Sequence, residues 1–325
     1  MEAALYDPED GFYARGPAIG RGGAFATVPG LHPAFADALA TELRASAAAL
    51  GGRPWTLVEV GPGDGTLALQ LRERLSDLAF EHVLVERAAG LARRQQDRLG
   101  TAAVRWVAAP EELAPFDGVV ISNELFDAQP VHLLRWPDEI AVGVARDGRF
   151  VEAPRPAGAE VAAALAGAGV DLRRGGRYAV STDAPALLAR LAARLRRGWL
   201  VTVDYGGEGL EVHDGRRPPV RTYVGGVSGG DPLSAPGRQD LTADVDFGAL
   251  RRTAARLGLV ERRYELQEDW LRRHGAVLDE PADRDAAGWR LAGLLEGRLS
   301  FRVLIHERRA PDRFVGRPGQ EGPVA

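Results

Sequence analysis

The sequence contains no cysteine and a single methionine among its 325 residues. Without cysteine there is no disulfide scaffold, no thiolate nucleophile and no cysteine-ligated zinc or iron–sulfur centre. This composition suits a reducing compartment. Residues 1–13 carry acids and glycine where a signal peptide would have a basic head and an apolar stretch. We therefore expect a cytoplasmic protein.

Lysine is also absent, and asparagine occurs once, as Asn123, so all 41 basic side chains are arginines. Lysine and asparagine codons are AT-rich, so a GC-rich genome accounts for both shortages and the arginines are weak evidence for phosphate binding. The net charge of −4 and the pI of about 5.9 offer no basic field to a nucleic acid. No apolar run approaches the roughly 20 residues of a membrane span. Neither nucleic acid nor membrane is an expected partner, and a homodimer is left open.

Several catalytic motifs are missing as well. The six histidines are scattered, with no His-x-x-x-His or His-Glu-x-x-His pair, so we expect no metal site. No Gly-x-Ser-x-Gly turn supplies a serine nucleophile for acyl transfer. The absence of a Gly-x-x-x-x-Gly-Lys-Ser/Thr loop excludes a P-loop NTPase.

What the sequence does contain is an alternation of apolar runs and helical patterns. Apolar runs predict buried strands over 55–60, 82–86, 104–107, 116–122 and 199–204. Leucines at helical spacing predict helices over 33–50, 64–75, 91–99 and 185–197. Alternation at this spacing is typical of an α/β fold with a doubly wound parallel sheet.

Other segments depart from this alternation. Residues 1–50 are expected to form an ordered arm and a helix, because the arm is rich in aromatic side chains. Short antiparallel strands predict an inserted β-extension at about 131–180, and a long glycine- and proline-rich loop fills a second insertion at about 206–240. The remaining expectations are a core over 51–310, a helix capped by Asp246, strands at 264–266 and 301–307, and a disordered tail over 311–325.

The most informative motif is the glycine loop Glu59-Val60-Gly61-Pro62-Gly63-Asp64-Gly65, between the first strand and the helix that follows it. Glycines let the backbone turn sharply and let a ligand lie against the main chain. A dinucleotide site needs its third glycine at position 66, which is Thr66, and Asp64 is a poor neighbour for a pyrophosphate. S-Adenosylmethionine, which has a positive centre and no phosphate, suits this loop better. An ordinary tight turn is the alternative.

Acidic side chains after the next strands suit the rest of such a ligand. Glu86 ends the second strand, and its carboxylate can accept hydrogen bonds from both ribose hydroxyls. Glu111 or Glu112, after the third strand, can accept from the adenine amino group. The alternatives are a solvated strand-end acid for Glu86 and a helix-start acid for the other two.

The fourth and fifth strands deliver polar residues to the same edge, where ligands bind in open α/β sheets. Asn123, Glu124 and Asp127 follow the fourth strand, and Asp204 and Tyr205 end the fifth. We expect them beside the site of methyl transfer. As alternatives, Asp127 caps a helix and Asp204 merely ends a strand.

Longer motifs span nearly the whole chain: Ala4–Pro8 with Gly11–Tyr13, Gly22–Pro29, Val58–Leu67, Asn123–Ala128 with Pro130, Asp204–Gly206 and Gly237–Phe247. Together they resemble the MidA-type methyltransferase family, which includes a mitochondrial complex I assembly factor acting as a protein arginine methyltransferase. The resemblance implies a class I methyltransferase fold with S-adenosylmethionine as donor. It also implies that Gly61, Gly63 and Gly65 form the donor loop, that Glu86 holds the ribose and that Asn123 and Glu124 lie beside the reacting end. The family's arm would place Phe25 and Thr27 near the donor, and we expect Glu59 of the glycine loop to bind the donor too.

Two parts depart from the family pattern. Ala24, Val28 and Gly30 stand where the family has Asp, Ser and Glu, and residues 297–302 replace its Gly-Glu-Leu-Phe-Lys pattern. Two carboxylates are therefore missing from the arm, which bears on the acceptor and not on the donor.

Three functions remain open. The first is a protein arginine methyltransferase, in which Glu124, Asp127 and Asp204 hold a protonated guanidinium by paired hydrogen bonds and Tyr205 orients it. The second is a small-molecule tailoring methyltransferase with a less charged acceptor, which the missing arm acids favour. The third is a non-catalytic assembly factor that retains the fold, and the intact glycine loop and Glu86 argue against it.

Overall fold

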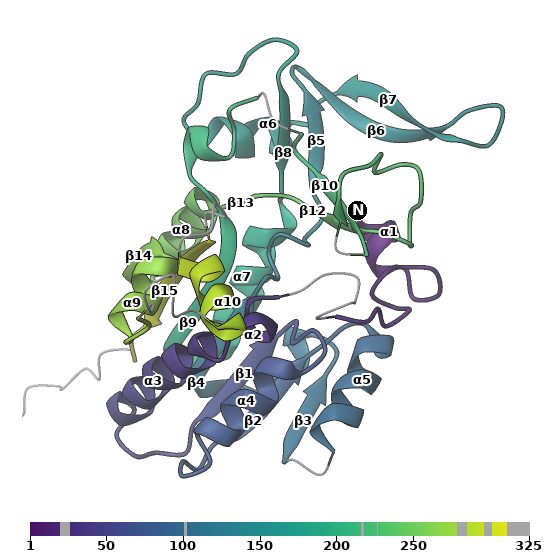
Figure 1. The fold of residues 1–325 in the computed structure, drawn as a ribbon. Coiled ribbons are helices and arrows are strands. Elements are labelled where there is room, and N and C mark those ends of the chain that lie inside the picture. The colour runs from purple at the N-terminus through teal and green to yellow at the C-terminus, as the bar shows by residue number, and fades with distance from the viewer. Residues whose placement is uncertain are drawn as a thin grey trace, which may run out of the picture.

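The computed structural model describes residues 1–19, 27–100, 103–215, 218–225, 227–277, 285–295 and 301–310. Its centre is the mostly parallel sheet that the sequence predicts, with the strand order β14-β15-β9-β4-β1-β2-β3 and β13 paired to β9 (Figure 1). The strands are β1 (Thr56–Val60), β2 (Glu81–Val85), β3 (Val104–Val107), β4 (Phe116–Asn123), β9 (Leu195–Gly207), β13 (Val245–Asp246), β14 (Val260–Leu266) and β15 (Phe301–Arg308). β15 runs antiparallel to both neighbours.

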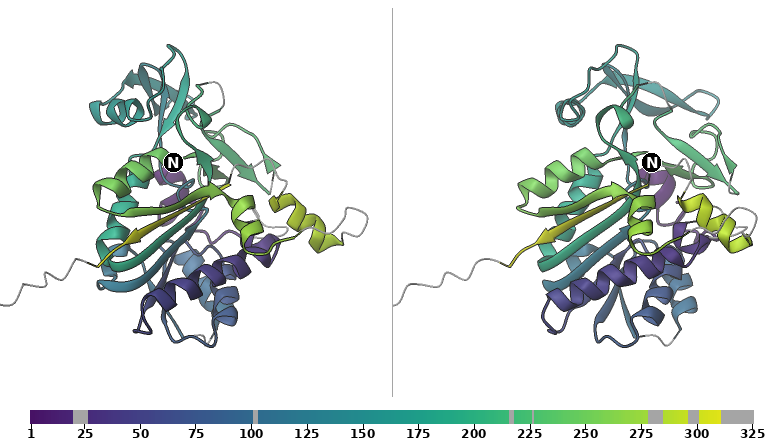
Figure 2. Two further views of the ribbon diagram at one scale, coloured as in Figure 1. Left: turned by 90° about the vertical axis from the view of Figure 1, so that its left-hand side faces the viewer. Right: turned by 60° about the vertical axis from the view of Figure 1, so that its left-hand side comes forward.

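Alternating side chains along the central strands separate two apolar layers. Leu57 of β1 packs in the same cluster as α3 and α4, whereas its neighbour Val58 packs with α7 and α8. Every residue of β1 is buried, as expected for a strand covered on both faces. The covering helices, seen around the sheet in Figure 2, are α3 (Ala34–Ala49), α4 (Thr66–Arg74), α5 (Ala89–Leu99), α7 (Asp183–Arg194) and α8 (Phe247–Arg256). Asp246 caps α8 by accepting from the Ala249 amide at 2.9 Å.

A second sheet occupies the predicted β-extension and projects beyond the main sheet at the top of Figure 1. Its strands β5 (His132–Arg135), β6 (Asp138–Val144), β7 (Phe150–Pro156) and β8 (Arg177–Val180) pair antiparallel in the order β7-β6-β5-β8. Helix α6 (Ala159–Ala166) packs Val161 and Leu165 against Leu134 and Tyr178, which gives the extension a small core of its own.

The glycine- and proline-rich segment after β9 contains more regular structure than the sequence predicts. A one-turn helix, η2 (Gly209–Glu211), is followed by a three-stranded antiparallel sheet in the order β11-β10-β12. These strands are β10 (Arg221–Val224), β11 (Val227–Ser228) and β12 (Asp240–Thr242). The prediction of a long loop is wrong here because strands of two to four residues are too short to show an alternating pattern.

Short helices lie above the carboxyl edge of the main sheet. The arm contributes α1 (Glu2–Tyr6) and α2 (Val28–Leu31), where only ordered loop was expected. Three further elements were not predicted, namely η1 (Pro110–Glu112), α9 (Gln267–Arg273) and α10 (Ala286–Leu295). Helices α2 and α10 contact each other and lie side by side in Figure 1. The tail predicted over 311–325 lies outside the described residues.

Candidate active site at the carboxyl edge of the sheet

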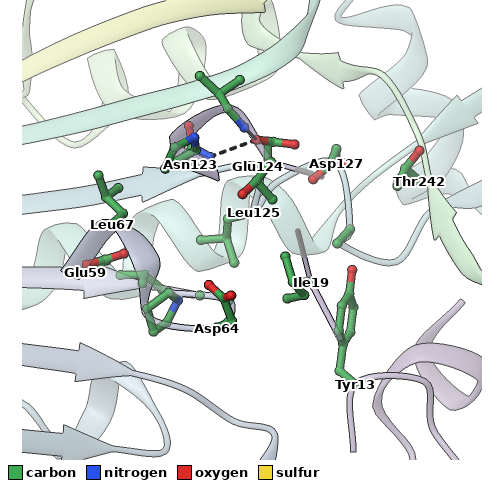
Figure 3. A pocket seen from close by; sticks show the side chains of 18 of the residues that line it. Tyr13, Ile19, Glu59, Asp64, Leu67, Asn123, Glu124, Leu125, Asp127 and Thr242 are labelled. Atoms are coloured by element: carbon green, nitrogen blue, oxygen red, sulfur yellow. Dashed lines mark hydrogen bonds between the residues drawn. The ribbon is translucent and has the colours of Figure 1, made fainter. Parts of the chain in front are cut away.

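A cavity of about 770 Å³ opens where β1, β2, β4 and β9 end, at the edge that the sequence predicts. Its glycine-loop end comprises residues 59–64 and Thr66 with Glu86, Ala108, Ala109 and Pro110. Its carboxylate end comprises Tyr6, Tyr13, Glu124, Asp127, Tyr205, Arg221, Tyr223, Asp240 and Thr242. Figure 3 shows Asn123, Glu124 and Leu125 between these two ends.

The glycine loop has the backbone geometry that requires its glycines. Gly61, Gly63 and Gly65 have φ angles of 64°, 58° and 82°, in the left-handed region. A Cβ on Gly61 would lie 2.7 Å from Leu125 Cδ1, so a side chain there would also displace the Leu125 side chain. Asp64 accepts from the Thr66 amide at 3.1 Å and pairs with Arg98, so its charge is already balanced at the start of α4.

Glu86 lies at the end of β2, buried in the cavity wall. Its Oε1 accepts from the Ala88 amide at 2.8 Å, and its Oε2 accepts from Gln95 Nε2 at 3.0 Å. Burial raises the pKa of Glu86 to about 7, although both hydrogen bonds favour the ionised form. Each oxygen can still accept a further hydrogen bond from a pair of neighbouring hydroxyls.

Two other buried groups near the glycine loop have unused acceptor atoms. Within the described residues, Glu59 Oε2 and Asn123 Oδ1 have no hydrogen-bond partner. His82 Nε2 lies 3.8 Å from Glu59 Oε2, and burial raises the pKa of the Glu59 carboxyl. Unpaired buried acceptors are costly, so these two atoms indicate a ligand with hydrogen-bond donors or a positive charge.

Glu111 does not occupy the position predicted for it beside an adenine ring. The described lining of the cavity includes Pro110 but not Glu111, whose carboxylate forms a bidentate pair with Arg190 at 2.6 and 2.9 Å. This pair lowers the pKa of Glu111 to about 2. Glu112 instead accepts from the Ala108 amide at 3.2 Å. The prediction of an acid at this place is corrected, because Arg190 and the backbone satisfy both carboxylates.

Glu124 stands at the junction of the two ends in a strained conformation. Its φ of 51° is rare for a residue with a side chain, and such strain concentrates at functional sites. Its Oε1 accepts from Asn123 Nδ2 at 3.0 Å (Figure 3). The same oxygen accepts from the Val28 amide at 2.9 Å, so the carboxylate also holds the arm. Burial raises its pKa to about 7.

Asp127 and Asp204, predicted as equivalent acids, have different surroundings. Asp127 accepts a short hydrogen bond from the Tyr205 hydroxyl, and its Oδ1 has no partner within the described residues. Asp204 accepts from the amides of Leu125, Phe126 and Tyr205 at 3.1, 2.8 and 3.0 Å. The expectation that Asp204 faces a substrate is corrected, since backbone amides occupy both oxygens and it is absent from the described cavity lining.

Asp240 on β12 is the buried acid that the site predictions missed. Its Oδ1 accepts from the Tyr13 hydroxyl at 2.8 Å and from the Leu241 amide at 3.0 Å, and burial raises its pKa to about 7. Asp240 lies within the motif 237–247 that carries the family resemblance. That motif was the available indication, although nothing in the local sequence assigns Asp240 to the cavity.

The arm closes one side of the cavity. Thr27, which the family resemblance places near the donor, lines it together with Val28, Pro29 and Leu31. Gly30 is exposed and is not part of the described lining. Phe25, Ala24 and residues 297–300 lie outside the described residues.

Comparison with known proteins identifies the family. A family model described as “Putative S-adenosyl-L-methionine-dependent methyltransferase” matches residues 35–264. The chain belongs to this family. A crystal structure of a Burkholderia thailandensis protein bound to S-adenosyl-homocysteine matches this methyltransferase with a TM-score of 0.83 and 32% identity, over 95% of this chain and 86% of that one.

Curated relatives of this methyltransferase have names that include an acceptor. The mouse protein named protein arginine methyltransferase NDUFAF7, mitochondrial, is 29% identical over 97% of this chain and 78% of its own length. The zebrafish protein of the same name is 28% identical over 78% of this chain and 67% of its own length.

These names contradict the expected cytoplasmic location, because the relatives are described as mitochondrial. Composition alone does not distinguish one reducing compartment from another. Within the described ranges, no helix is long and apolar enough to cross a membrane.

The methyltransferase has a class I fold and uses S-adenosylmethionine as its methyl donor. The groups at the glycine-loop end of its cavity fit this donor. The left-handed glycines leave bare backbone, Glu86 offers a bidentate acceptor, and Glu59 Oε2 and Asn123 Oδ1 are unpaired acceptors for positively charged or N–H groups.

Proposed function

We propose that this methyltransferase modifies an arginine side chain of a protein. The observation that carries the proposal is the carboxylate end of the cavity, where Asp127 and Asp240 are buried and Glu124 is half-buried. Burial raises the pKa of each, because removal from water disfavours the ionised carboxylate. A cationic acceptor supplies a compensating charge, whereas a neutral acceptor leaves the carboxylates uncompensated.

The aromatic walls suit a planar cation in particular. The guanidinium of Arg221 already lies over the Tyr205 ring, 4.8 Å from its centroid, while it pairs with Asp244 at 2.8 Å. Tyr6, Tyr13 and Tyr223 provide further aromatic surface in the same end of the cavity. Guanidinium groups favour both stacking on aromatic rings and bidentate pairing with carboxylates, and this cavity offers the two together.

The proposed chemistry divides between the two ends of the cavity. When bound, S-adenosylmethionine supplies a methyl group on a positively charged sulfur. The acceptor nitrogen gains this methyl group and loses one proton, while the sulfur keeps the electron pair of the broken bond. Carboxylates must therefore orient the guanidinium, draw its charge away from the reacting nitrogen and accept the proton.

We assign these tasks to different acids. Glu124 is the proton acceptor, because it lies between the two ends of the cavity (Figure 3) and its pKa of about 7 suits proton transfer near neutral pH. Asp127 and Asp240 hold the remaining guanidinium nitrogens, with Tyr205 and Tyr13 fixing their orientation. Asp204 is a positioning residue that holds the segment 125–127 through its backbone amides.

A small-molecule acceptor was the competing hypothesis, and it depended on the missing arm carboxylates. One of these positions, Gly30, is exposed and lies outside the described cavity lining. The carboxylate end also contains Asp240, an acid in addition to those predicted from the sequence. The names of the curated relatives point in the same direction.

The test is to identify the residue that gains a methyl group. Protein extract from cells lacking this gene is incubated with purified methyltransferase and donor labelled on the methyl group, and the products are mapped by tandem mass spectrometry. We expect label on arginine with the parent protein and a loss of at least about 100-fold with Glu124→Gln. Label confined to small molecules, or to residues other than arginine, overturns the proposal.

A further inference from the structure

Gln95 on α5 links three parts of the donor site, although it does not line the described cavity. Its side chain is completely buried. Gln95 Nε2 donates to Glu86 Oε2 at 3.0 Å and to the Gly63 carbonyl at 2.9 Å. Its Oε1 accepts from Trp106 Nε1 on β3 at 3.1 Å. One amide therefore joins the glycine loop, the end of β2 and strand β3.

The hydrogen-bond partners fix which way this amide points. Trp106 Nε1 can only donate, so the atom facing it must be the carbonyl oxygen of Gln95. The amide nitrogen then faces the Gly63 carbonyl and the Glu86 carboxyl group. The carbonyl can only accept a hydrogen bond, and so can Glu86 when it is ionised. The network has one consistent arrangement, and rotating the amide would leave buried groups unpaired.

Glu86 receives its orientation from this arrangement. The Ala88 amide holds Oε1 and Gln95 holds Oε2, so the plane of the carboxylate is fixed from two sides. Arg87, the other charged neighbour, is turned toward the arm, where it pairs with Glu2 at 2.6 Å and stacks on Tyr6. Gln95 is thus a neutral donor that fixes the carboxylate at the oxygen that Ala88 leaves free.

We propose that Gln95 is a positioning residue for the donor ribose. It aligns the Glu86 carboxylate with the two neighbouring ribose hydroxyls and holds the glycine loop in place relative to that carboxylate. A carboxylate can accept from adjacent hydroxyls in a bidentate manner only when both oxygens are suitably directed. The shared amide sets this direction relative to Gly63. The role goes beyond packing, because an apolar side chain of the same size would fill the space but leave Glu86 held at Oε1 alone.

The experiment compares two neighbouring glutamines of α5. Gln95→Met removes the amide while keeping the length of the side chain, and Gln96→Met is the matched control at an exposed position. Binding is measured by calorimetry with S-adenosylhomocysteine and with its analogue lacking the ribose 2′-hydroxyl. The parent protein is expected to prefer the hydroxylated ligand by about tenfold or more, the scale of one hydrogen bond to a charged group.

If Gln95 positions Glu86, Gln95→Met binds S-adenosylhomocysteine about tenfold more weakly but changes little for the deoxy analogue, so that the preference disappears. Gln96→Met keeps the parent values. Equal weakening for both ligands would show that Gln95 only supports the fold of the site. Unchanged binding of both would show that Glu86 needs no support. Either result overturns the proposal.

A second variant keeps the proposal testable if Gln95→Met does not fold. Trp106→Phe removes the N–H that fixes the amide orientation and retains an aromatic ring on β3. We expect a smaller loss of the same kind, confined to the ligand with the 2′-hydroxyl. An equal effect on both ligands, or none, contradicts the role of the network.

Discussion

The Tyr13 hydroxyl donates a hydrogen bond of 2.8 Å to Asp240 Oδ1 and thereby joins the N-terminal arm to strand β12. Tyr13 and Asp240 lie 227 positions apart in the sequence, and both line the carboxylate end of the cavity. Removing the hydroxyl with Tyr13→Phe leaves Asp240 with one hydrogen bond fewer and its carboxylate less well oriented. We expect arginine methylation to slow by about tenfold, with binding of S-adenosylhomocysteine unchanged.

Tyr178→Phe is the matched control for this variant, because Tyr178 is a buried tyrosine in the core of the β-extension whose hydroxyl accepts from the Arg173 amide. Steady-state kinetics and calorimetry are measured on both variants. A Tyr13→Phe protein that loses donor binding in parallel with activity would show that Tyr13 acts on the arm as a whole and not on Asp240.

Gly63→Val is expected to abolish donor binding. Gly63 has a φ of 58°, and an added Cβ would lie 3.4 Å from Ile19 Cδ1, within the glycine-loop end of the cavity. A branched side chain there strains the backbone by about 1–2 kcal/mol and fills space next to the ligand. Gly258→Val provides the control, because Gly258 has a φ of 72° but nothing within 4 Å of an added Cβ. We expect the two variants to have comparable melting temperatures and Gly63→Val alone to lose donor binding. Donor binding retained by Gly63→Val would refute the prediction.

Glu86→Gln is expected to weaken S-adenosylhomocysteine binding by about 1–3 kcal/mol. The pKa of Glu86 is about 7 without ligand, and the ionised form is the better acceptor for ribose hydroxyls. Affinity of the parent protein should therefore decrease as the pH falls through about 7, and Glu86→Gln should lack this part of the pH dependence. Glu111→Gln, at the surface pair with Arg190, should bind like the parent protein. Calorimetry over this pH range decides, and an unchanged dissociation constant for Glu86→Gln would make Glu86 an ordinary strand-end acid.

Glu124→Gln should make the stability of the unligated protein less dependent on pH between about 4.5 and about 7. Burial raises the pKa of Glu124 from an ordinary value of 4.5 to about 7, so the folded state binds the proton more tightly than the unfolded state does. The contribution of this group to stability therefore declines as the pH rises from about 4.5 to about 7. The variant should lose less thermal stability than the parent between these pH values, whereas Glu73→Gln at an exposed position should not. Parallel melting curves for the variant and the parent over this range would contradict the assignment.

The glycine loop and the central sheet could be predicted from sequence because their determinants are local. The spacing of Gly61, Gly63 and Gly65 sets the backbone at the end of β1, and apolar runs identify strands buried on both faces. The positions of Glu86 and Asn123 at the carboxyl edge of the sheet followed from the same reasoning, since parallel strands end at one edge.

Other parts of the site depend on contacts between distant segments. Asp240 reaches the cavity because β12 pairs with β10. Its partner Tyr13 comes from the arm, far away in the sequence. Arg190 removes Glu111 from the site, and backbone amides of the segment after β4 occupy Asp204. A strand-end acid can therefore be placed at the edge from sequence, but its free lone pairs cannot be counted until its neighbours are known.

The most direct test of the account separates the two ends of the cavity in one variant. Asp240→Asn removes a charge from the carboxylate end and leaves the glycine loop and Glu86 intact. The affinity for S-adenosylhomocysteine and the rate of arginine methylation are measured on the same preparation. We predict an affinity within about threefold of the parent value and a rate reduced by about 100-fold or more, because the lost carboxylate acts on the acceptor alone. Arginine methylation at the parent rate would contradict the central claim that this end of the cavity binds the guanidinium.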